Sequence, residues 1–239
     1  MPDESAMKKS TFFYLIFLYV LLFLVIAPIV FQFFGGWQEV IEACYPFSVF
    51  FNASIAFLIY TFSIKGLIFE KPIERERLPF FVYSANVLLC FGFLLVSSCV
   101  FEAVSYFLKI SGGLHEVIFP SSILGWLNFF FGVICAAFFE EAIYRFYLPR
   151  AFREIFGNMK FFHNADKKNN LRLLVLCEAF PLFLFSLGHI YLGIFGFFNA
   201  LLCGAALRLC MVRTKSLWIS FAIHSAYNFL SFLMIFILM

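Results

Sequence analysis

Seven long apolar runs constrain the fold of this chain more than any other feature. A helix needs about 20 apolar residues to cross the hydrocarbon core of a bilayer. Each of the seven runs reaches or approaches that length: 11–34, 47–69, 80–107, 119–144, 171–190, 194–212 and 217–239. With 64% hydrophobic residues and a mean hydropathy of +0.97, the composition excludes a soluble domain. We therefore expect an all-α, polytopic membrane helix bundle with about seven transmembrane helices.

The basic residues predict the orientation of these spans. If the N-terminus is cytoplasmic, 16 of the 17 Lys and Arg residues lie inside and only Lys109 lies outside. This distribution follows the positive-inside rule for seven spans with the C-terminus outside. The first run has no convincing cleavage site and is interpreted as an uncleaved anchor. The Phe-rich composition and the short loops favour a bacterial cell inner membrane.

The chain is predicted to form a single integral-membrane domain over residues 1–239. Its longest connection, residues 145–172, is basic. Residues 145–156 have helical spacing, so they can form either a helix on the cytoplasmic membrane surface or a solvated basic loop. No soluble segment is large enough for a nucleic-acid-binding fold, so we expect membrane lipids and no nucleic acid as partners. The oligomeric state cannot be read from the sequence.

Two adjacent glutamates and an arginine end the fourth apolar run. An ionisable group inside a membrane costs at least about 3 kcal/mol, so it is usually functional. Glu141 and Arg145 are four residues apart and should form a salt bridge on one helix face. Glu140 points about 100° away from Glu141, which leaves it free to act as a general base in a cavity. A helix-end ion pair near the headgroups is the alternative.

Two histidine motifs occur in later runs. Phe185 and His189 are one helical turn apart, and so are His224 and Asn228. An imidazole and a carboxamide on one face can donate hydrogen bonds to an oxyanion. Alone, His189 could be a packing residue and the second motif an interhelical polar clamp. Three such motifs in different spans are difficult to explain as packing, so we place the candidate active site here.

The motif order resembles that of the CPBP family, the CAAX proteases and bacteriocin-processing enzymes, also called the Abi family. The similar segments are Glu-Glu-x-x-x-Arg at 140–145, Phe-x-x-x-His at 185–189 and His-x-x-x-Asn at 224–228. The resemblance covers about residues 120–235. We therefore expect residues 119–235 to be the catalytic core and residues 1–110 to be additional N-terminal spans.

The resemblance implies an intramembrane endopeptidase, similar to type II CAAX prenyl endopeptidases, that hydrolyses a peptide bond in a membrane-associated peptide or protein. In that family's pattern, Glu140 and His189 activate water, and His224 and Asn228 stabilise the oxyanion. Glu141 and Arg145 support the base, and Phe185 accompanies His189. Whether the substrate is prenylated stays open.

Three alternatives remain at this stage. A zinc-dependent variant of the same protease is possible, because two histidines and a glutamate can bind zinc. We favour a reaction without a metal or other cofactor, because there is no His-Glu-x-x-His spacing and the amide of Asn228 suits an oxyanion better than zinc. The second alternative is a non-catalytic membrane protein for bacteriocin immunity or peptide binding. The third is a small transporter or channel, although no inverted repeat is visible.

The predicted depths of the motifs conflict. His189 lies about 26 Å into the fifth span, whereas Glu140 is expected near the inner end of the fourth. Either Pro181 and a glycine-rich turn fold His189 back, or Glu140 lies deeper than the predicted span places it. Two further acidic residues within apolar runs, Glu102 and Glu178, are expected to be paired or close to the interface.

Overall fold

The structure is a computed structural model that describes residues 4–33, 47–69, 79–109, 119–157 and 167–238. These residues are almost entirely helical and contain no strand. They include seven helices that are long and apolar enough to cross a membrane: Ser10–Phe33, Phe47–Ile64, Phe80–Leu108, Ile123–Gly157, Asn170–Leu187, Ile190–Thr214 and Leu217–Ile237. The predicted all-α, polytopic architecture with seven spans is confirmed.

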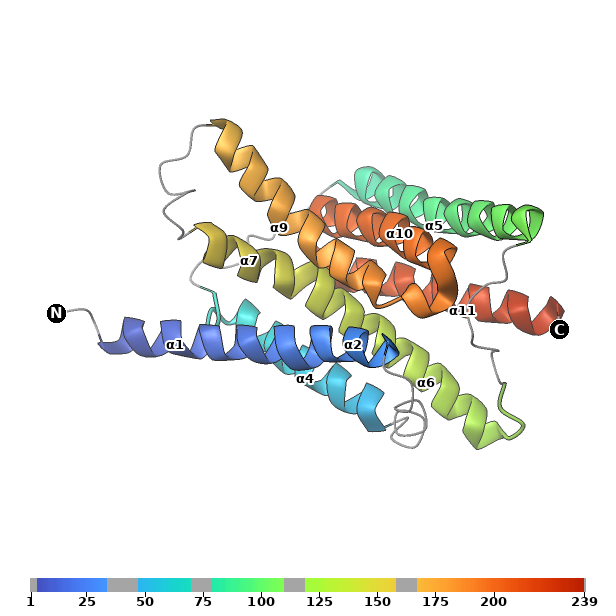
Figure 1. Cartoon of the computed structure of the whole chain (residues 1–239), viewed down its shortest axis with the longest axis horizontal. Helices are drawn as coiled ribbons and strands as arrows, with labels where there is room; N and C mark the ends of the chain where they lie inside the picture. Colours follow the sequence, from blue (N-terminus) through green and yellow to red (C-terminus); the bar gives the residue numbers. More distant parts are fainter. Residues whose placement is uncertain (1–3, 34–46, 70–78, 110–118, 158–166, 239) are drawn as a thin grey trace.

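The first three spans consist of α1 (Glu4–Tyr19), the π-helix η1 (Val20–Ile26) and α2 (Ala27–Phe33), then α4 (Phe47–Ile64), then α5 (Phe80–Leu108). The remaining elements are α6 (Ile123–Glu140), the π-helix η2 (Glu141–Tyr147), α7 (Leu148–Gly157), α9 (Lys167–Leu187), the 3-10 helix η3 (Ile190–Leu192), α10 (Gly193–Thr214) and α11 (Leu217–Leu238). In Figure 1, α1 begins at one end of the bundle and α11 ends at the other, as an odd number of crossings requires.

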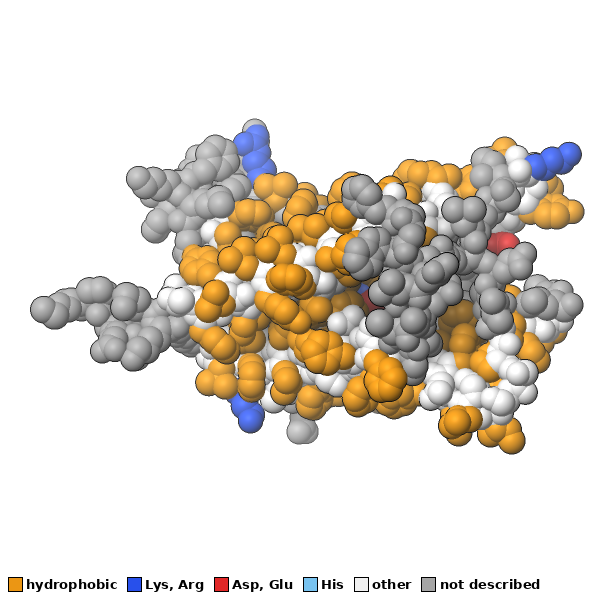
Figure 2. Space-filling view, turned by 60° about the horizontal axis from the view of Figure 1, so that its bottom comes forward, with side chains coloured by type: hydrophobic (Ala, Val, Ile, Leu, Met, Phe, Trp, Pro, Cys, Tyr) orange, Lys and Arg blue, Asp and Glu red, His pale blue; other side chains and the backbone are white. Residues whose placement is uncertain are grey.

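The outer surface of the bundle is apolar. Hydrophobic side chains cover most of the described part of the face shown in Figure 2. Many phenylalanines point outward, among them Phe47 and Phe80, which are 80% and 84% exposed. Such exposure is unfavourable in water but matches a hydrocarbon solvent. The phenylalanine content of this chain therefore belongs in large part to the surface that would face lipid.

The fourth span is longer than predicted. The segments α6, η2 and α7 form one continuous helix of 35 residues, Ile123–Gly157, which crosses the bundle in Figure 1. The predicted end at residue 144 is wrong, because the helix continues to Gly157 and Arg145 is buried within the bundle. Arg145 does not end the span because its charge is balanced inside the bundle and the residues after it, Phe146 to Leu148, are buried. The helical spacing of residues 145–156 is confirmed, which excludes the solvated loop.

The long fourth helix removes the conflict between the two motif depths. Glu140 is its central residue, about 26 Å from either end. His189 follows directly after the C-terminus of α9. Glu140 is therefore farther from the end of its helix than the sequence predicted, as the second of the two explanations requires.

A tight turn joins α9 to α10. It consists of His189 and η3, and it ends at Gly193, whose φ of +83° favours glycine. A Cβ atom at Gly196 would lie only 2.4 Å from Cβ of Leu192, so this position also requires a glycine for the turn to close. The glycine-rich turn expected between spans five and six is confirmed, and it positions His189.

Candidate active site

One cavity collects nearly all of the predicted site residues. It has a volume of about 380 Å³, and it is lined by residues of α4, α5, α6, η2, α9, η3, α10 and α11. Its lining includes six of the seven predicted side chains: Glu140, Arg145, Phe185, His189, His224 and Asn228. The seventh, Glu141, is fully buried behind the wall. Residues almost 90 positions apart in the sequence therefore meet around one space.

Glu141 is the buried anchor of this cluster. Its Oε1 lies 3.4 Å from Nη1 of Arg145 and 2.9 Å from Nδ1 of His224. Its Oε2 accepts a hydrogen bond from the hydroxyl of Ser220. The predicted salt bridge between Glu141 and Arg145 is confirmed. A carboxylate with no exposed surface requires such partners, because an unpaired buried charge is very costly.

Glu140 occupies a different environment from Glu141. Its side chain is 22% exposed and lines the cavity, as the separation around the helix predicted. Its Oε2 lies 3.7 Å from Nε2 of His224 and 4.0 Å from Nη1 of Arg145. These distances are too long for strong hydrogen bonds. The Glu140 carboxylate is therefore held near positive charge while its side chain remains partly exposed to the cavity.

The aromatic ring of Phe185 covers the guanidinium group of Arg145. Its guanidinium carbon lies 3.6 Å from the ring centroid of Phe185, a short cation–π distance. Gly204 of α10 makes this packing possible, because a Cβ atom there would lie 3.1 Å from Phe185 and 3.3 Å from Nη2 of Arg145. The three side-chain nitrogens of Arg145 make no hydrogen bond with a described residue. All three nitrogens are buried, so the guanidinium is stabilised by the carboxylate of Glu141 and the ring of Phe185.

His189 is oriented by the backbone of α9. Its Nδ1 lies 2.9 Å from the carbonyl oxygen of Phe185, and the two rings are 4.4 Å apart. A carbonyl oxygen only accepts hydrogen bonds, so Nδ1 must carry the proton. In the neutral ring, Nε2 then has a free lone pair. Phe185 therefore supports His189 through both its ring and its carbonyl group.

A second ion cluster holds the π-helix η2 against α9 and α10. Arg208 of α10 binds both carboxylate oxygens of Glu178, at 2.6 and 2.7 Å, and Arg153 lies 3.4 Å from the same carboxylate. The Nη1 group of Arg208 also donates to the backbone carbonyl of Arg145 at 2.8 Å. The expected pairing of Glu178 is confirmed. π-Helical turns often mark functional sites, and this one carries Glu141 and Arg145.

The cavity lies largely in a part of the chain that matches a known protein family. Residues 121–230 match a family model described as type II CAAX prenyl endopeptidase Rce1-like. These residues form an Rce1-like domain. The match confirms the resemblance to the CAAX protease family and supports assigning the domain to the intramembrane peptidases. No curated protein and no solved structure matches the chain significantly.

The Rce1-like domain lies within the segment expected to be the catalytic core, and it contains every residue described above around the cavity. Together with the seven membrane-crossing helices, it identifies the chain as an integral, multi-pass membrane protein. Such a protein is surrounded by lipid, and peptides are the substrates that the family indicates.

The helices before the Rce1-like domain also contact its cavity. Ser97 of α5 donates to Oδ1 of Asn199 at 2.8 Å, and Nδ2 of Asn199 donates to Ser98 at 3.0 Å. Ser98 is hydrogen-bonded in turn to the hydroxyl of Tyr227. Asn199 and Tyr227 both line the cavity. The α5 helix therefore orients two polar cavity residues of the Rce1-like domain.

The donor set does not match a catalytic zinc site. Such a site requires about three protein ligands around one point. Among the described residues, no group of three or more His, Cys, Asp or Glu side chains is close enough to hold a metal ion. The hydrogen bonds at Nδ1 of His224 and of His189 leave Nε2 of each ring free, so these two bonds do not distinguish a metal-free site from a metal-bound one. Since the described residues offer no three-ligand group, we derive no reaction step through a metal.

Sequence reasoning missed several residues around the site. Ser220 precedes His224 by one helical turn, as Asn228 follows it, so the helical stripe that revealed the second motif could also have indicated Ser220. The residues Ser97, Ser98 and Asn199 gave no such signal, because isolated small polar residues in apolar runs are common. The contact between Arg208 and the carbonyl of Arg145 depends on how α10 packs, and no local pattern predicts it.

Proposed function

We propose that this protein is an intramembrane endopeptidase that hydrolyses a peptide bond in a membrane-associated peptide or protein, with Glu140 as general base. One observation carries the proposal. One carboxylate, two histidines, an arginine and two amides line a single cavity inside a membrane-crossing bundle, and a second carboxylate is buried behind its wall. Groups of this kind are costly in a membrane unless they serve chemistry or transport. The Rce1-like match favours peptide hydrolysis.

Water activation is assigned to Glu140 and His189. Both line the cavity, and the partly exposed carboxylate of Glu140 can accept a proton. The hydrogen bond from Nδ1 of His189 to Phe185 leaves Nε2 as an acceptor for the second water hydrogen. A water molecule held between these acceptors presents its oxygen lone pair to the peptide carbonyl. General-base assistance of this kind contributes about 10²- to 10⁴-fold.

Oxyanion stabilisation is assigned to His224 and Asn228, which line the same cavity. Nδ1 of His224 donates to Glu141, so Nε2 can also donate only when the ring carries both protons. Nε2 of His224 is directed to the cavity side, 3.7 Å from Oε2 of Glu140. A hydrogen-bond donor at that position would stabilise the negative charge that develops on the carbonyl oxygen in a water-poor site. The amide of Asn228 supplies the second donor.

In the proposed reaction, Glu140 carries one proton from the water molecule to the leaving group. The water oxygen bonds to the carbonyl carbon while Glu140 takes its proton. When the tetrahedral intermediate collapses, the carbon–nitrogen bond breaks and Glu140 returns that proton to the leaving nitrogen. The products are a new carboxyl terminus and a new amino terminus. Glu141 and Arg145 keep their charges throughout and position His224 and Glu140.

The decisive experiment compares new N-termini and C-termini in membranes of cells that express the wild-type protein or Glu140→Gln at matched levels. Fragments that occur only with the wild type would establish proteolysis and name the substrate. The matched control is Glu102→Gln, which removes an exposed carboxylate of α5 that does not line the cavity. Its profile should equal that of the wild type. Identical profiles for the wild type and Glu140→Gln, with both proteins abundant and folded, would contradict the proposal and favour peptide binding or immunity.

The metal-free mechanism has a separate test. Purified protein is dialysed against a strong zinc chelator, and cleavage of the substrate identified above is then measured with and without added Zn²⁺. We expect the rate to change by less than about twofold, because no reaction step uses a metal. Loss of activity that only Zn²⁺ restores would instead establish the zinc-dependent alternative.

A further inference from the structure

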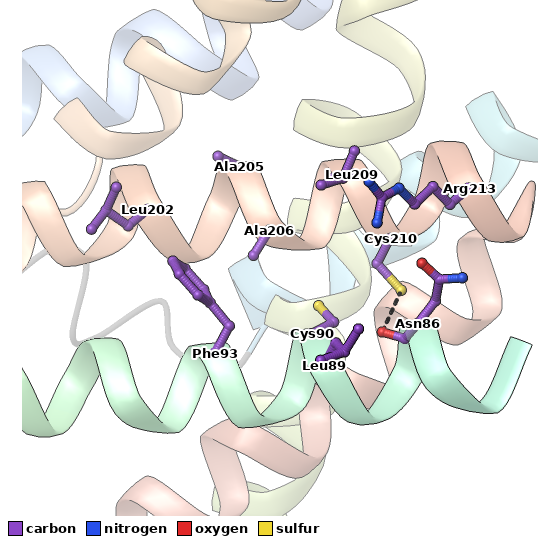
Figure 3. Close-up of a pocket in the computed structure, with 10 residues that line it drawn as sticks. All are labelled: Asn86, Leu89, Cys90, Phe93, Leu202, Ala205, Ala206, Leu209, Cys210 and Arg213. Carbon is purple, nitrogen blue, oxygen red and sulfur yellow. Dashed lines mark hydrogen bonds between the residues drawn. The ribbon is translucent and has the colours of Figure 1, made fainter. Parts of the chain in front are cut away.

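A second, separate pocket lies between α5 and α10. It is a groove of about 340 Å³, and the described residues that line it all belong to these two helices (Figure 3). The catalytic cavity uses other residues of the same helices, Leu94, Cys203 and Leu207. These three side chains pack with Cys90 and Cys210 of the groove into one apolar cluster. That cluster lies between the groove and the cavity, so the groove is not an extension of the active site.

The lining of the groove is suited to hydrocarbon. Leu89 and Leu209 are 70% and 50% exposed, as expected of residues that face lipid. Ala205 and Ala206 are the small residues among the larger side chains and leave space between the two helices (Figure 3). Small residues on a membrane helix allow another apolar group to approach closely. An extended hydrocarbon chain fits such a groove better than water does.

The length of the groove corresponds to one leaflet. Along α10 its lining runs from Leu202 to Arg213, a rise of about 16 Å, which is roughly half of a hydrocarbon core about 30 Å thick. Arg213 belongs to the last turn of α10, where the helix leaves the span. The groove thus extends from the level of the headgroups toward the middle of the bilayer.

The polar end of the groove carries one positive charge. Arg213 is exposed, lies at the end of the groove in Figure 3, and forms no ion pair with a described residue. A guanidinium binds phosphate oxygens through paired hydrogen bonds. We propose that this groove binds one acyl chain of an anionic phospholipid, with the lipid phosphate on Arg213. The binding site is independent of the proposed peptidase activity.

The experiment measures lipid binding to the purified full-length protein after removal of native lipids. Phosphatidylglycerol or phosphatidylcholine is titrated in, and bound lipid is counted by native mass spectrometry. The wild type should bind phosphatidylglycerol more tightly than phosphatidylcholine. Arg213→Gln should weaken the binding of phosphatidylglycerol about fivefold, which is the effect of losing roughly one cation near a headgroup. The binding of phosphatidylcholine should not change. The matched control is Lys109→Gln, which removes a cation beyond the opposite end of α5 and should have no effect.

A second variant tests the groove itself. Ala205→Leu places a larger side chain in the groove and should weaken both lipids at least fivefold, whereas Ala222→Leu, at an exposed position of α11 outside the groove, should not. The proposal would be overturned if the wild type bound the two lipids equally. It would also be overturned if Arg213→Gln or Ala205→Leu bound phosphatidylglycerol as tightly as the wild type does. If Arg213→Gln does not purify as a folded protein, Ala205→Leu still decides, because it leaves the charge in place.

Discussion

At the scale of single residues, the two adjacent glutamates have opposite surroundings. Glu141 has no exposed surface and contacts Arg145, His224 and Ser220, whereas Glu140 lines the cavity and lies 3.7 Å from Nε2 of His224. A one-residue step around the helix thus separates a buried, paired carboxylate from one that lines the cavity. In the proposed mechanism, the first holds His224 and the second acts as the base.

Ser220 offers a test of this division of roles. Ser220→Ala removes the donor to Oε2 of Glu141 and leaves that oxygen without its bond. We expect the free energy of unfolding to fall by about 1–3 kcal/mol. Cleavage should slow about tenfold, the result of losing about 1.4 kcal/mol of transition-state stabilisation through a displaced His224. Thermal unfolding in detergent and cleavage kinetics measure the two effects.

The control for Ser220 is Ser54→Ala in α4, which removes only a bond to the carbonyl of Phe50 in its own helix. It should change neither quantity by more than a few tenths of a kcal/mol. Unaltered cleavage in Ser220→Ala would show that Glu141 is held well enough by Arg145 and His224 alone.

Arg145 provides a second prediction at this scale. Arg145→Lys keeps the charge but loses the flat guanidinium that stacks on Phe185. We expect the protein to remain folded but cleavage to fall by more than about tenfold. Arg145→Met should destabilise the fold by about 3–5 kcal/mol, because it leaves Glu141 without its cation. If Arg145→Lys cleaved at the wild-type rate, only the charge of Arg145 would matter.

At the scale of helices, α5 connects the N-terminal spans to the Rce1-like domain. Its Ser97 and Ser98 bond to Asn199 of α10, and Ser98 also bonds to Tyr227 of α11. Hydrogen bonds between membrane helices contribute about 0.6 kcal/mol on average and up to about 2. The spans before the domain therefore shape the wall of its cavity.

A double-mutant cycle with Ser98→Ala and Tyr227→Phe tests this connection. The two variants should be coupled by about 0.5–1.5 kcal/mol in unfolding free energy, because each removes the same bond. A control cycle pairs Tyr227→Phe with Ser84→Ala, whose hydroxyl bonds only within α5, and should give a coupling close to zero. Zero coupling in the first cycle would show that the bond contributes nothing to the fold.

At the scale of the whole molecule, orientation in the membrane is a prediction from charge. Reporters fused after Gly157, the last residue of the fourth span, and after Met239 should lie on opposite sides, the first in the cytoplasm and the second outside. Activity of an export-dependent phosphatase should occur only in the C-terminal fusion, and fluorescence of a cytoplasm-dependent protein only in the other. The reverse result would place the basic end of the bundle outside and contradict the positive-inside assignment.

Much of this architecture could be predicted because its causes are local. The apolar runs predict the spans, and helical spacing of four residues predicts the pairing of Glu141 with Arg145 and of Phe185 with His189. The end of the fourth span could not be predicted, because a charged residue such as Arg145 normally indicates the membrane surface. Its burial depends on Phe185 and Gly204, which reach it from other helices. Packing between helices distant in sequence has no signature in a single run.

The central position of Glu140 in a 35-residue helix limits what a substrate must do to be cut. A peptide segment that crosses a bilayer is normally helical, and in a helix every carbonyl oxygen already accepts a hydrogen bond from four residues further along. Such a carbonyl is neither free nor exposed to attack. A chain that reaches the midpoint of this protein must therefore be locally unwound. Cleavage should select segments with low helix propensity, such as those rich in glycine or containing proline, as much as any particular side chain.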